Sequence, residues 1–216
     1  MDDVWGETKD WLDDFRPERM ARFEVGPTRG TWAALGVLGV MALGVGVAWS
    51  LRQRWGKRLD VVPHFDIGRY LGTWYEIARY PNPMEIACSG ATAHYSLRTD
   101  GSLVVVQRCR KDGQVVSARG LATMADAAHP AKLNIRFVGS LGVYAGHYWI
   151  IQLGPHYEYA VVSEPERRYL WILSRTPRLP DDVYRGILTR LQGQGFDTRR
   201  VVMTPQAGEK CPDPLS

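Results

Sequence analysis

The sequence predicts an all-β fold, an antiparallel up-and-down barrel of eight strands, with one N-terminal transmembrane helix before it and a helix near its C-terminal end. Short apolar or alternating segments separated by turn residues begin near Gly72, residues 31–51 contain no charged side chain, and apolar residues recur at helical spacing after Pro180. The expected organisation is an N-terminal extension (1–30), a membrane span (31–51), a linker (52–63), the barrel (64–206) and a tail (207–216).

The predicted strands follow one another at hairpin spacing. Asp100-Gly101 and Asp112-Gly113 place glycine where a tight turn needs a positive φ, so both segments are expected to be hairpin turns. The strands are expected at 73–80, 90–98, 103–110, 115–124, 132–138, 147–153, 158–163 and 169–174. A barrel of about eight strands has an interior just wide enough for one small ligand.

After the last of these strands the apolar period changes to that of a helix. Val183, Ile187, Leu188 and Leu191 recur at helical spacing, following Pro180-Asp181-Asp182, a typical helix start. A short additional strand is expected at 199–203.

Residues 31–51 are long enough, as a helix, to cross the bilayer, and Trp32 and Trp49 stand near the two interfaces. Basic residues flank both ends, so charge does not decide the orientation. Residues 46–48 also resemble the cleavage site of a signal peptide, so removal of the segment is an open alternative. Ala42 and Gly46, small residues four apart, permit close helix pairing and hence a homodimer. The acidic residues 1–15 fit either a short amphipathic helix or a weakly ordered extension.

Composition excludes several classes of function. The chain has 27 basic and 23 acidic residues, and a scattered net charge of +4 gives no support for a nucleic-acid partner. Its five histidines and three cysteines show neither metal-ligand spacing nor the order of a catalytic triad, so no metal or cofactor is expected. Cys88 and Cys109 fall on neighbouring predicted strands and can form a disulfide in an oxidising compartment if a bulge adjusts the register. Cys211 is then left over.

Two motifs resemble the lipocalin family, most closely the bacterial lipocalins that group with apolipoprotein D. The first is Tyr70-Leu71-Gly72-Thr73-Trp74-Tyr75-Glu76-Ile77-Ala78-Arg79, similar to the family's G-x-W motif, and the second is Leu170-Trp171-Ile172-Leu173-Ser174-Arg175-Thr176-Pro177. The family's middle motif is degenerate here, as His156-Tyr157-Glu158-Tyr159. The resemblance covers about 64–206. It implies a barrel floor in which Arg175 lies across the Trp74 indole beside Gly72, as a structural contact.

The resemblance also implies a cavity for a hydrophobic or amphipathic ligand, of the fatty acid or lysophospholipid class, for lipid storage, transport or envelope maintenance. Trp149 corresponds to a Trp that lines the pocket in the apolipoprotein D group, and two-residue alternation places Ile151 and Leu153 on the same face. Arg79 or His147 near the mouth would suit an amphipathic ligand. The expected ligand-binding residues are Trp149, Ile151, Leu153, Phe137, Tyr144, Tyr80 and Met84.

Two other functions remain open at this stage. One lipocalin lineage uses a thiol on its second strand as a nucleophile, which makes Cys88 a candidate, although no neighbouring residue in the sequence favours a thiolate, and a non-enzymatic role is expected. The other is a docking module with a vestigial pocket. Bacterial relatives are commonly held by a lipid on a Cys, but no Cys precedes Cys88 here. An anchor, if it is kept, must then be the protein segment itself. The resemblance and the possible disulfide imply the bacterial inner membrane with the barrel in the periplasm, or the periplasm alone after cleavage.

Overall fold

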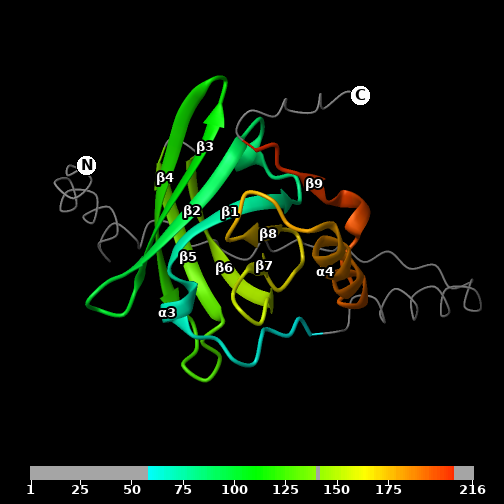
Figure 1. Cartoon of the computed structure of the whole chain (residues 1–216). Helices are drawn as coiled ribbons and strands as arrows, with labels where there is room; N and C mark the ends of the chain where they lie inside the picture. Colours follow the sequence, from blue (N-terminus) through cyan, green and yellow to red (C-terminus); the bar gives the residue numbers. More distant parts are fainter. Residues whose placement is uncertain (1–57, 140–141, 207–216) are drawn as a thin grey trace, which may run out of the picture. The chain divides into compact units, whose positions relative to one another are not determined.

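A computed structural model describes residues 58–139 and 142–206 of the chain. They form a closed antiparallel barrel of strands β1 to β8, in which β1 pairs with both β2 and β8 (Figure 1). The strands are β1 (Gly72–Arg79), β2 (Ser89–Leu97), β3 (Leu103–Lys111), β4 (Gln114–Met124), β5 (Lys132–Gly139), β6 (Gly142–Leu153), β7 (Tyr159–Ser163), β8 (Leu170–Ser174) and the short β9 (Val202–Met203). The helices are α3 (Ile67–Tyr70), α4 (Asp181–Gly193) and the 3-10 turns η2 (Pro83–Glu85) and η3 (Thr198–Arg200).

The eight-stranded barrel and the C-terminal helix expected from the sequence are confirmed. Gly101 and Gly113 have φ of 81° and 77°, as the hairpin turns require. The largest difference is in β6, which begins at Gly142 instead of residue 147. Alternation in this segment is weakened by glycines and alanine, which made its first half look like a loop.

Apolar side chains form two layers, one on each face of the barrel wall. The interior layer includes Trp74, Tyr95, Leu133 and Ile150. The outer layer lies between the wall and α4, which packs Ile187 and Leu191 against β7 and β8 residues such as Val161 and Ile172 (Figure 1). The strands under α4 are therefore apolar on both faces, and this weakens any argument from alternation about which side chains face inward.

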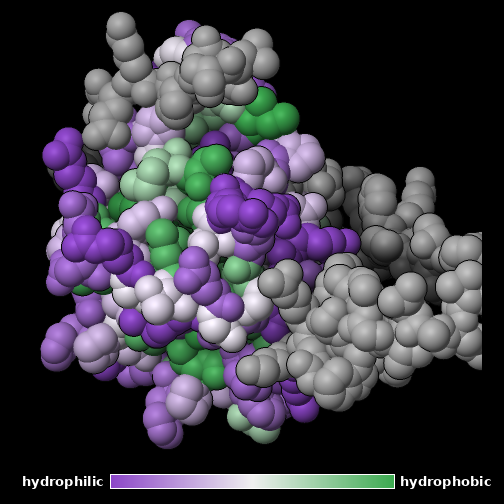
Figure 2. Space-filling view, turned by 90° about the vertical axis from the view of Figure 1, so that its right-hand side faces the viewer, coloured by the Kyte–Doolittle hydropathy of each residue, from purple (hydrophilic) through white to green (hydrophobic). Residues whose placement is uncertain are grey.

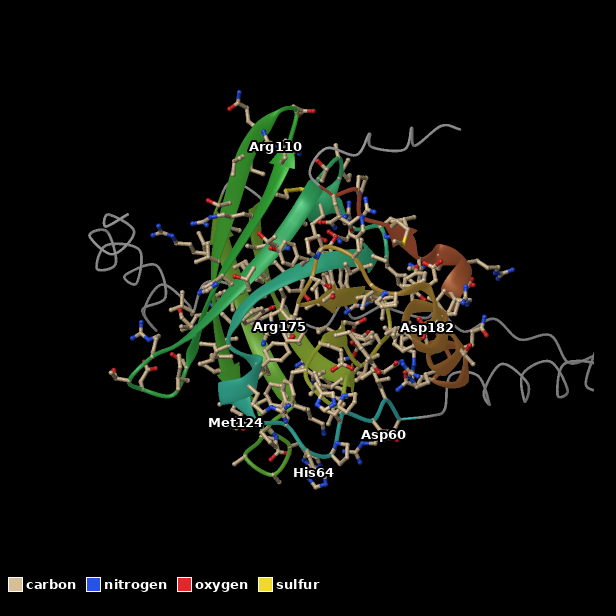
Figure 3. All side chains as sticks on the ribbon, in the orientation of Figure 1. Asp60, His64, Arg110, Met124, Arg175 and Asp182 are labelled. Atoms are coloured by element: carbon tan, nitrogen blue, oxygen red, sulfur yellow. A yellow bond between two sulfur atoms is a disulfide. The ribbon has the colours of Figure 1, made fainter. Side chains whose placement is uncertain are left out.

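The chain before β1 is part of the packed domain. Leu59 is buried in the outer layer, and the backbone N–H of Val62 donates to the Ile150 carbonyl at 3.0 Å. Asp66 is the N-cap residue of the following α3, and its carboxylate accepts a hydrogen bond from the Gly68 amide. This helix lies at the end of the barrel where β1 begins and β4 ends, the end marked by Met124 in Figure 3, whereas Arg110 marks the opposite end.

On the face of the molecule drawn in Figure 2, the apolar surface is divided into small areas. The face in Figure 2 shows separate hydrophobic spots among polar side chains. Over residues 58–139 and 142–206, no helix is both long and apolar enough to cross a membrane. The predicted extension, the span at 31–51 and the tail at 207–216 lie outside the described residues.

Candidate ligand-binding site

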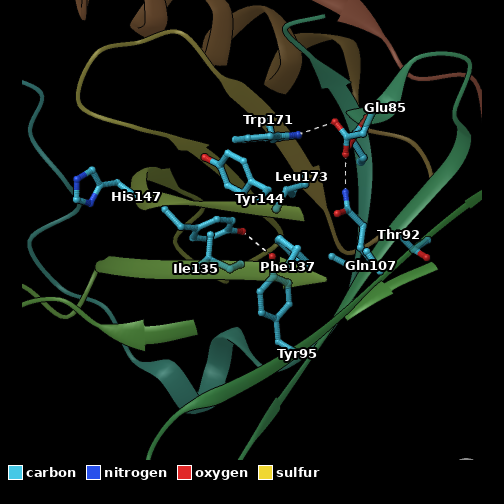
Figure 4. A pocket seen from close by; sticks show the side chains of 14 residues that line it. Glu85, Thr92, Tyr95, Gln107, Ile135, Phe137, Tyr144, His147, Trp171 and Leu173 are labelled. Carbon is cyan, nitrogen blue, oxygen red and sulfur yellow. Dashed lines mark hydrogen bonds between the residues drawn. The ribbon is translucent and has the colours of Figure 1, made fainter. Parts of the chain in front are cut away.

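A cavity of about 60 Å³ lies inside the barrel (Figure 4). Its wall is mainly apolar and aromatic, with polar groups at its two ends. Glu85 lies at one end, between Trp171 and Gln107, and Tyr95 lies at the other (Figure 4). The lining residues are Glu76, Glu85, Thr92, Ala93, Tyr95, Gln107, Ala118, Ile135, Phe137, Tyr144, His147, Tyr148, Trp171 and Leu173.

A buried group of two carboxylates and one guanidinium forms the polar end of this cavity. We call Glu76, Arg79 and Glu85 the acidic cluster; their exposed fractions are 3%, 8% and 3%. Glu76 and Arg79 are three residues apart on β1, a spacing that normally puts side chains on opposite faces of a strand. The pairing of β1 with β8 shifts register between Glu76 and Ala78, and this bulge lets both residues meet on the same side.

Arg79 links the two carboxylates. Its Nη1 donates to Glu76 Oε1 at 2.6 Å and to the Thr204 hydroxyl at 2.8 Å. Its Nη2 donates to the backbone carbonyl of Glu85 at 2.8 Å, and its Nε lies 3.9 Å from Glu85 Oε2. The guanidinium therefore ties the loop between β1 and β2 to the strand.

The Glu85 carboxylate is fully engaged by neighbours from three segments. Oε1 accepts from Gln107 Nε2 at 2.5 Å, and Oε2 accepts from Asn82 Nδ2 at 2.5 Å and from the Trp171 indole at 3.0 Å. These bonds join the β1–β2 loop to β3 and β8. Glu85 is thus a structural tie across the barrel as well as a lining residue.

Glu76 is bonded on one oxygen alone. Oε1 accepts from Arg79 and from the Thr204 hydroxyl, whereas Oε2 accepts no hydrogen bond that the structure records among residues 58–139 and 142–206. Burial, reinforced by the nearby charge of Glu85, raises the pKa of Glu76 from 4.5 to about 8, despite the opposing effect of Arg79. One guanidinium does not neutralise two buried carboxylates, so Glu76 holds a proton near neutral pH.

Tyr95 and Tyr148 line the opposite end of the cavity, and their hydroxyls belong to a group of three that includes the Tyr70 hydroxyl. Tyr148 is 2.9 Å from the Tyr70 hydroxyl and 2.7 Å from the Tyr95 hydroxyl. Burial raises the pKa of all three phenols, so they stay neutral over the whole physiological range. The Tyr70 ring packs on the Trp74 ring, with ring centroids 4.8 Å apart.

The predicted structural floor lies beneath these tyrosines. The Arg175 guanidinium is 3.8 Å from the centroid of the Trp74 ring and donates to the backbone carbonyls of Thr73 and Arg69 at 2.9 Å and 2.7 Å. The Trp74 indole donates to the Tyr70 carbonyl at 2.8 Å. Gly72 has a φ of 91°, which a side chain would strain. These contacts close this end of the barrel.

The predicted disulfide between Cys88 and Cys109 is present, with Cα atoms 5.5 Å apart. Pairing of β2 with β3 shifts register between Ser89 and Thr92, which is the bulge that the sequence argument required. The bond fastens the far end of the β1–β2 loop to β3. It also removes the free thiol that a nucleophilic Cys88 would need.

Some of the expected ligand residues line the cavity. Phe137 and Tyr144 do so, half-buried, from β5 and β6. Leu153 packs against the interior layer but is not among the cavity-lining residues. Met84 belongs to η2, and its side chain lies outside what the structure describes. Ligand contact by these residues stays a prediction.

Three of the expected ligand residues, Trp149, Ile151 and Tyr80, face outward and not into the barrel. Trp149 and Ile151 lie in the outer layer, with Lys132 Nζ 4.9 Å from the Trp149 ring centroid. Tyr80 is also in that layer, and its hydroxyl donates to the Asp197 carbonyl at 3.0 Å. The reason is the register of β6, in which Tyr148 and Ile150 face inward, followed by a bulge between Ile150 and Gln152. That bulge separates Leu153 from the face of Trp149 and Ile151.

The residues that form the polar lining of the cavity were not predicted from the sequence. Glu76 and Trp171 stand inside the two quoted motifs, and Gln107 and Glu85 are the other two. A charged side chain in the middle of an apolar strand, as Glu76 is, was the available signal, because such a residue is rarely buried without a partner. Glu85 carried no such signal, since its position in a turn is typical of exposed acids.

These features define a class of protein: a small antiparallel barrel with one sealed end and an interior cavity. The protein-family model of the lipocalin-like domain matches residues 65–206 of the sequence. The outer membrane lipoprotein Blc of Escherichia coli (strain K12) is 40% identical over 154 residues, which cover 70% of this chain and 85% of that protein. Apolipoprotein D of Mus musculus is 32% identical over 162 residues, covering 71% and 82%. The chain therefore belongs to the lipocalin family.

Solved structures agree on the fold. Insecticyanin from the tobacco hornworm Manduca sexta superposes with a TM-score of 0.59 at 19% identity, covering 70% of this chain and 86% of that one. At this identity the likeness concerns the architecture alone. It supports the assignment of β1 to β8 as one closed barrel.

Proposed function

We propose that this protein binds a small hydrophobic or amphipathic ligand, of the fatty acid or lysophospholipid class, inside the barrel. The observation that carries the proposal is a cavity with an apolar, aromatic wall and a few buried polar groups, which is the usual composition of a small-molecule site. Phe137 and Tyr144 are the ligand contacts that we expect from the sequence analysis, together with Met84 and Leu153. Ligand binding is the role assigned here in preference to catalysis.

The cavity must widen to admit such a ligand. A volume of about 60 Å³ is far below the roughly 300–1,000 Å³ of typical ligand pockets. Aromatic side chains narrow the cavity. The ring of Tyr144 contacts the ring of Tyr169 edge-on, and the Tyr169 ring stacks on Trp171, with ring centroids 5.9 Å apart in both pairs. Rotation of the half-buried Phe137 and Tyr144 would lengthen the cavity without moving a strand.

Filling the cavity tests the proposal. Ala118 lines it from β4, and its neighbour Ser117 is exposed on the same strand. Delipidated full-length protein should take up one equivalent of the neutral fluorophore N-phenyl-1-naphthylamine. Ala118→Leu should weaken uptake by about tenfold or more, because the added methylenes occupy the ligand's space. Ser117→Leu adds the same side chain outside the barrel and should bind normally.

If folded wild-type protein takes up no fluorophore, the result would contradict ligand binding and favour a docking module. Equal uptake by the two leucine variants would place the fluorophore outside the cavity. Circular dichroism and thermal unfolding of each variant establish that the barrel is intact.

We further propose that residues 31–51 tether the barrel to a membrane of the bacterial cell envelope, with the barrel in the periplasm. Three observations support this proposal. The segment is apolar and long enough to span a bilayer, and the Escherichia coli relative is named an outer membrane lipoprotein. The Cys88–Cys109 disulfide is typical of an oxidising compartment. Native mass spectrometry of the detergent-extracted chain tests it. A mass that lacks residues 1–48 would show that the segment is cleaved.

A further inference from the structure

The acidic cluster gives the cavity a charge that a carboxylate ligand does not match. With both glutamates ionised, Glu76, Glu85 and Arg79 sum to a single negative charge, buried in the barrel interior. A buried charge without a partner is costly, so the site is balanced either by a proton on Glu76 or by a cation brought by a ligand. An anionic head would add a second unpaired negative charge.

The two Nη atoms of Arg79 cannot bind an incoming anion without losing their own partners. Arg79 Nη1 already donates to Glu76 and Thr204, and Nη2 to the backbone carbonyl of Glu85. Glu85 has donors on both oxygens. Within residues 58–139 and 142–206, two polar atoms of the cluster have no recorded hydrogen bond. One is Arg79 Nε, which lies 3.9 Å from Glu85 Oε2, and the other is Glu76 Oε2, an acceptor on a buried side chain that lines the cavity.

We propose that the cavity selects single-chain amphiphiles whose head carries a protonated amine, and that Glu76 Oε2 accepts the hydrogen bond of that ammonium group. This rests on the part of the proposed function that places one amphipathic ligand in the cavity. It changes the head group expected there, because it disfavours the carboxylate of a fatty acid. The alkyl chain then runs along Ile135 and Leu173 toward the tyrosines at the other end. Binding exchanges one positive charge for another: the proton of Glu76 leaves to solvent as the ammonium enters.

This exchange predicts a pH dependence. The charged groups that face Glu76 are Arg79 from β1 and Glu85 from η2, with the neutral Thr204 hydroxyl from the segment after β9. The other titratable groups of the cavity are His147, exposed at its edge, and the phenols Tyr95, Tyr144 and Tyr148, whose pKa values burial raises. Affinity for an amine should rise as pH increases toward the Glu76 pKa of about 8, because less work is needed to remove the proton.

Three probes with the same dodecyl chain test the proposal: dodecylamine, dodecanol and dodecanoic acid. Each displaces N-phenyl-1-naphthylamine from delipidated full-length protein, at concentrations below its solubility limit or critical micelle concentration. At about pH 8, dodecylamine should bind about tenfold or more tighter than dodecanol, the gain expected of a charge-assisted hydrogen bond, and dodecanoate should bind least. The ratio of amine to alcohol affinity should fall toward one in Glu76→Gln. Glu166→Gln, on an exposed loop outside the cluster, removes the same charge and should keep the ratio.

Each outcome separates this proposal from the function on which it rests. If wild-type protein binds neither dodecanol nor dodecylamine, ligand binding in the cavity fails. If it binds dodecanol and prefers dodecanoate or shows no preference, the amine selectivity is overturned while ligand binding stands. If the preference for dodecylamine over dodecanol survives in Glu76→Gln, Glu76 is excluded as the acceptor. The same holds if Glu166→Gln loses the preference to the same extent as Glu76→Gln. If Glu76→Gln does not fold, the wild-type ratio decides: a ratio that does not change between about pH 6 and about pH 8 contradicts the exchange.

Discussion

The two ends of the barrel are each organised around an arginine, and they use it differently. At the floor, Arg175 stacks on Trp74 and donates to two backbone carbonyls. At the opposite end, the buried Arg79 lies between the carboxylates of Glu76 and Glu85. The floor is built from groups whose charge is constant, whereas the acidic cluster contains a carboxyl group whose charge changes near neutral pH.

This difference separates stability from selectivity. Removal of a floor residue should cost stability at every pH, because stacking and carbonyl hydrogen bonds do not titrate over the physiological range. A change in the acidic cluster should instead alter how stability and binding depend on pH. The same strand, β1, supplies Trp74 to one end and Glu76 and Arg79 to the other.

The largest expected effect is at the floor. Trp74 is completely buried, so Trp74→Ala should lower the free energy of unfolding by about 3–5 kcal/mol, through lost apolar burial and a cavity beneath the tyrosines. Urea unfolding followed by circular dichroism measures it. Trp149→Ala is the matched control on the outer face, half-buried, and should cost clearly less. Equal losses at the two positions would refute the idea that the floor is the more important structural element.

The second effect concerns the disulfide near the acidic cluster. Cys88 and Cys109 are 21 residues apart, so replacing both with alanine should reduce stability by about 3 kcal/mol through the greater freedom of the unfolded chain. The comparison is sharpened by hydrogen exchange. Amides of the β1–β2 loop should lose protection while those around Trp74 keep theirs, and uniform loss would contradict the separation of the two ends.

The floor could be predicted from the sequence because its parts are local and rigid. Gly72 and Trp74 are two residues apart on one strand, and the resemblance supplied Arg175 as their partner. The hairpins at Gly101 and Gly113 were predictable for a similar reason: positive φ at a turn needs glycine, and this requirement is visible in the sequence.

The site could be predicted only in part. Trp149 and Ile151 on one face of β6 are as apolar as Tyr148 and Ile150 on the other, because the outer face of this wall is covered too. Alternation divides such a strand into two faces without saying which one is inside. The acidic cluster depends on a bulge in β1, and a bulge reverses the parity of every residue that follows it.

The last expected effect is a change in how stability depends on pH, from Glu76→Gln. The folded pKa of Glu76, about 8, lies above its ordinary value of 4.5, so the folded state holds a proton that the unfolded state has released. The stability of wild-type protein should therefore decline as pH rises through this interval, because unfolding releases the proton of Glu76 and a higher pH favours that release. Glutamine does not ionise, and its amide keeps an oxygen for Arg79 and Thr204, so the variant should lose much of this decline.

The melting temperature of both proteins between about pH 5 and about pH 9 measures this slope. The two curves should lie closest at the acid end and separate as pH rises, with the variant more stable at the alkaline end. Asp60→Asn, an exposed carboxyl outside the barrel wall, should follow the wild-type curve. Parallel curves for wild type and Glu76→Gln would mean that Arg79 keeps Glu76 ionised throughout. The acidic cluster would then be a fixed ion pair, as constant in charge as the floor, and the contrast between the two ends would disappear.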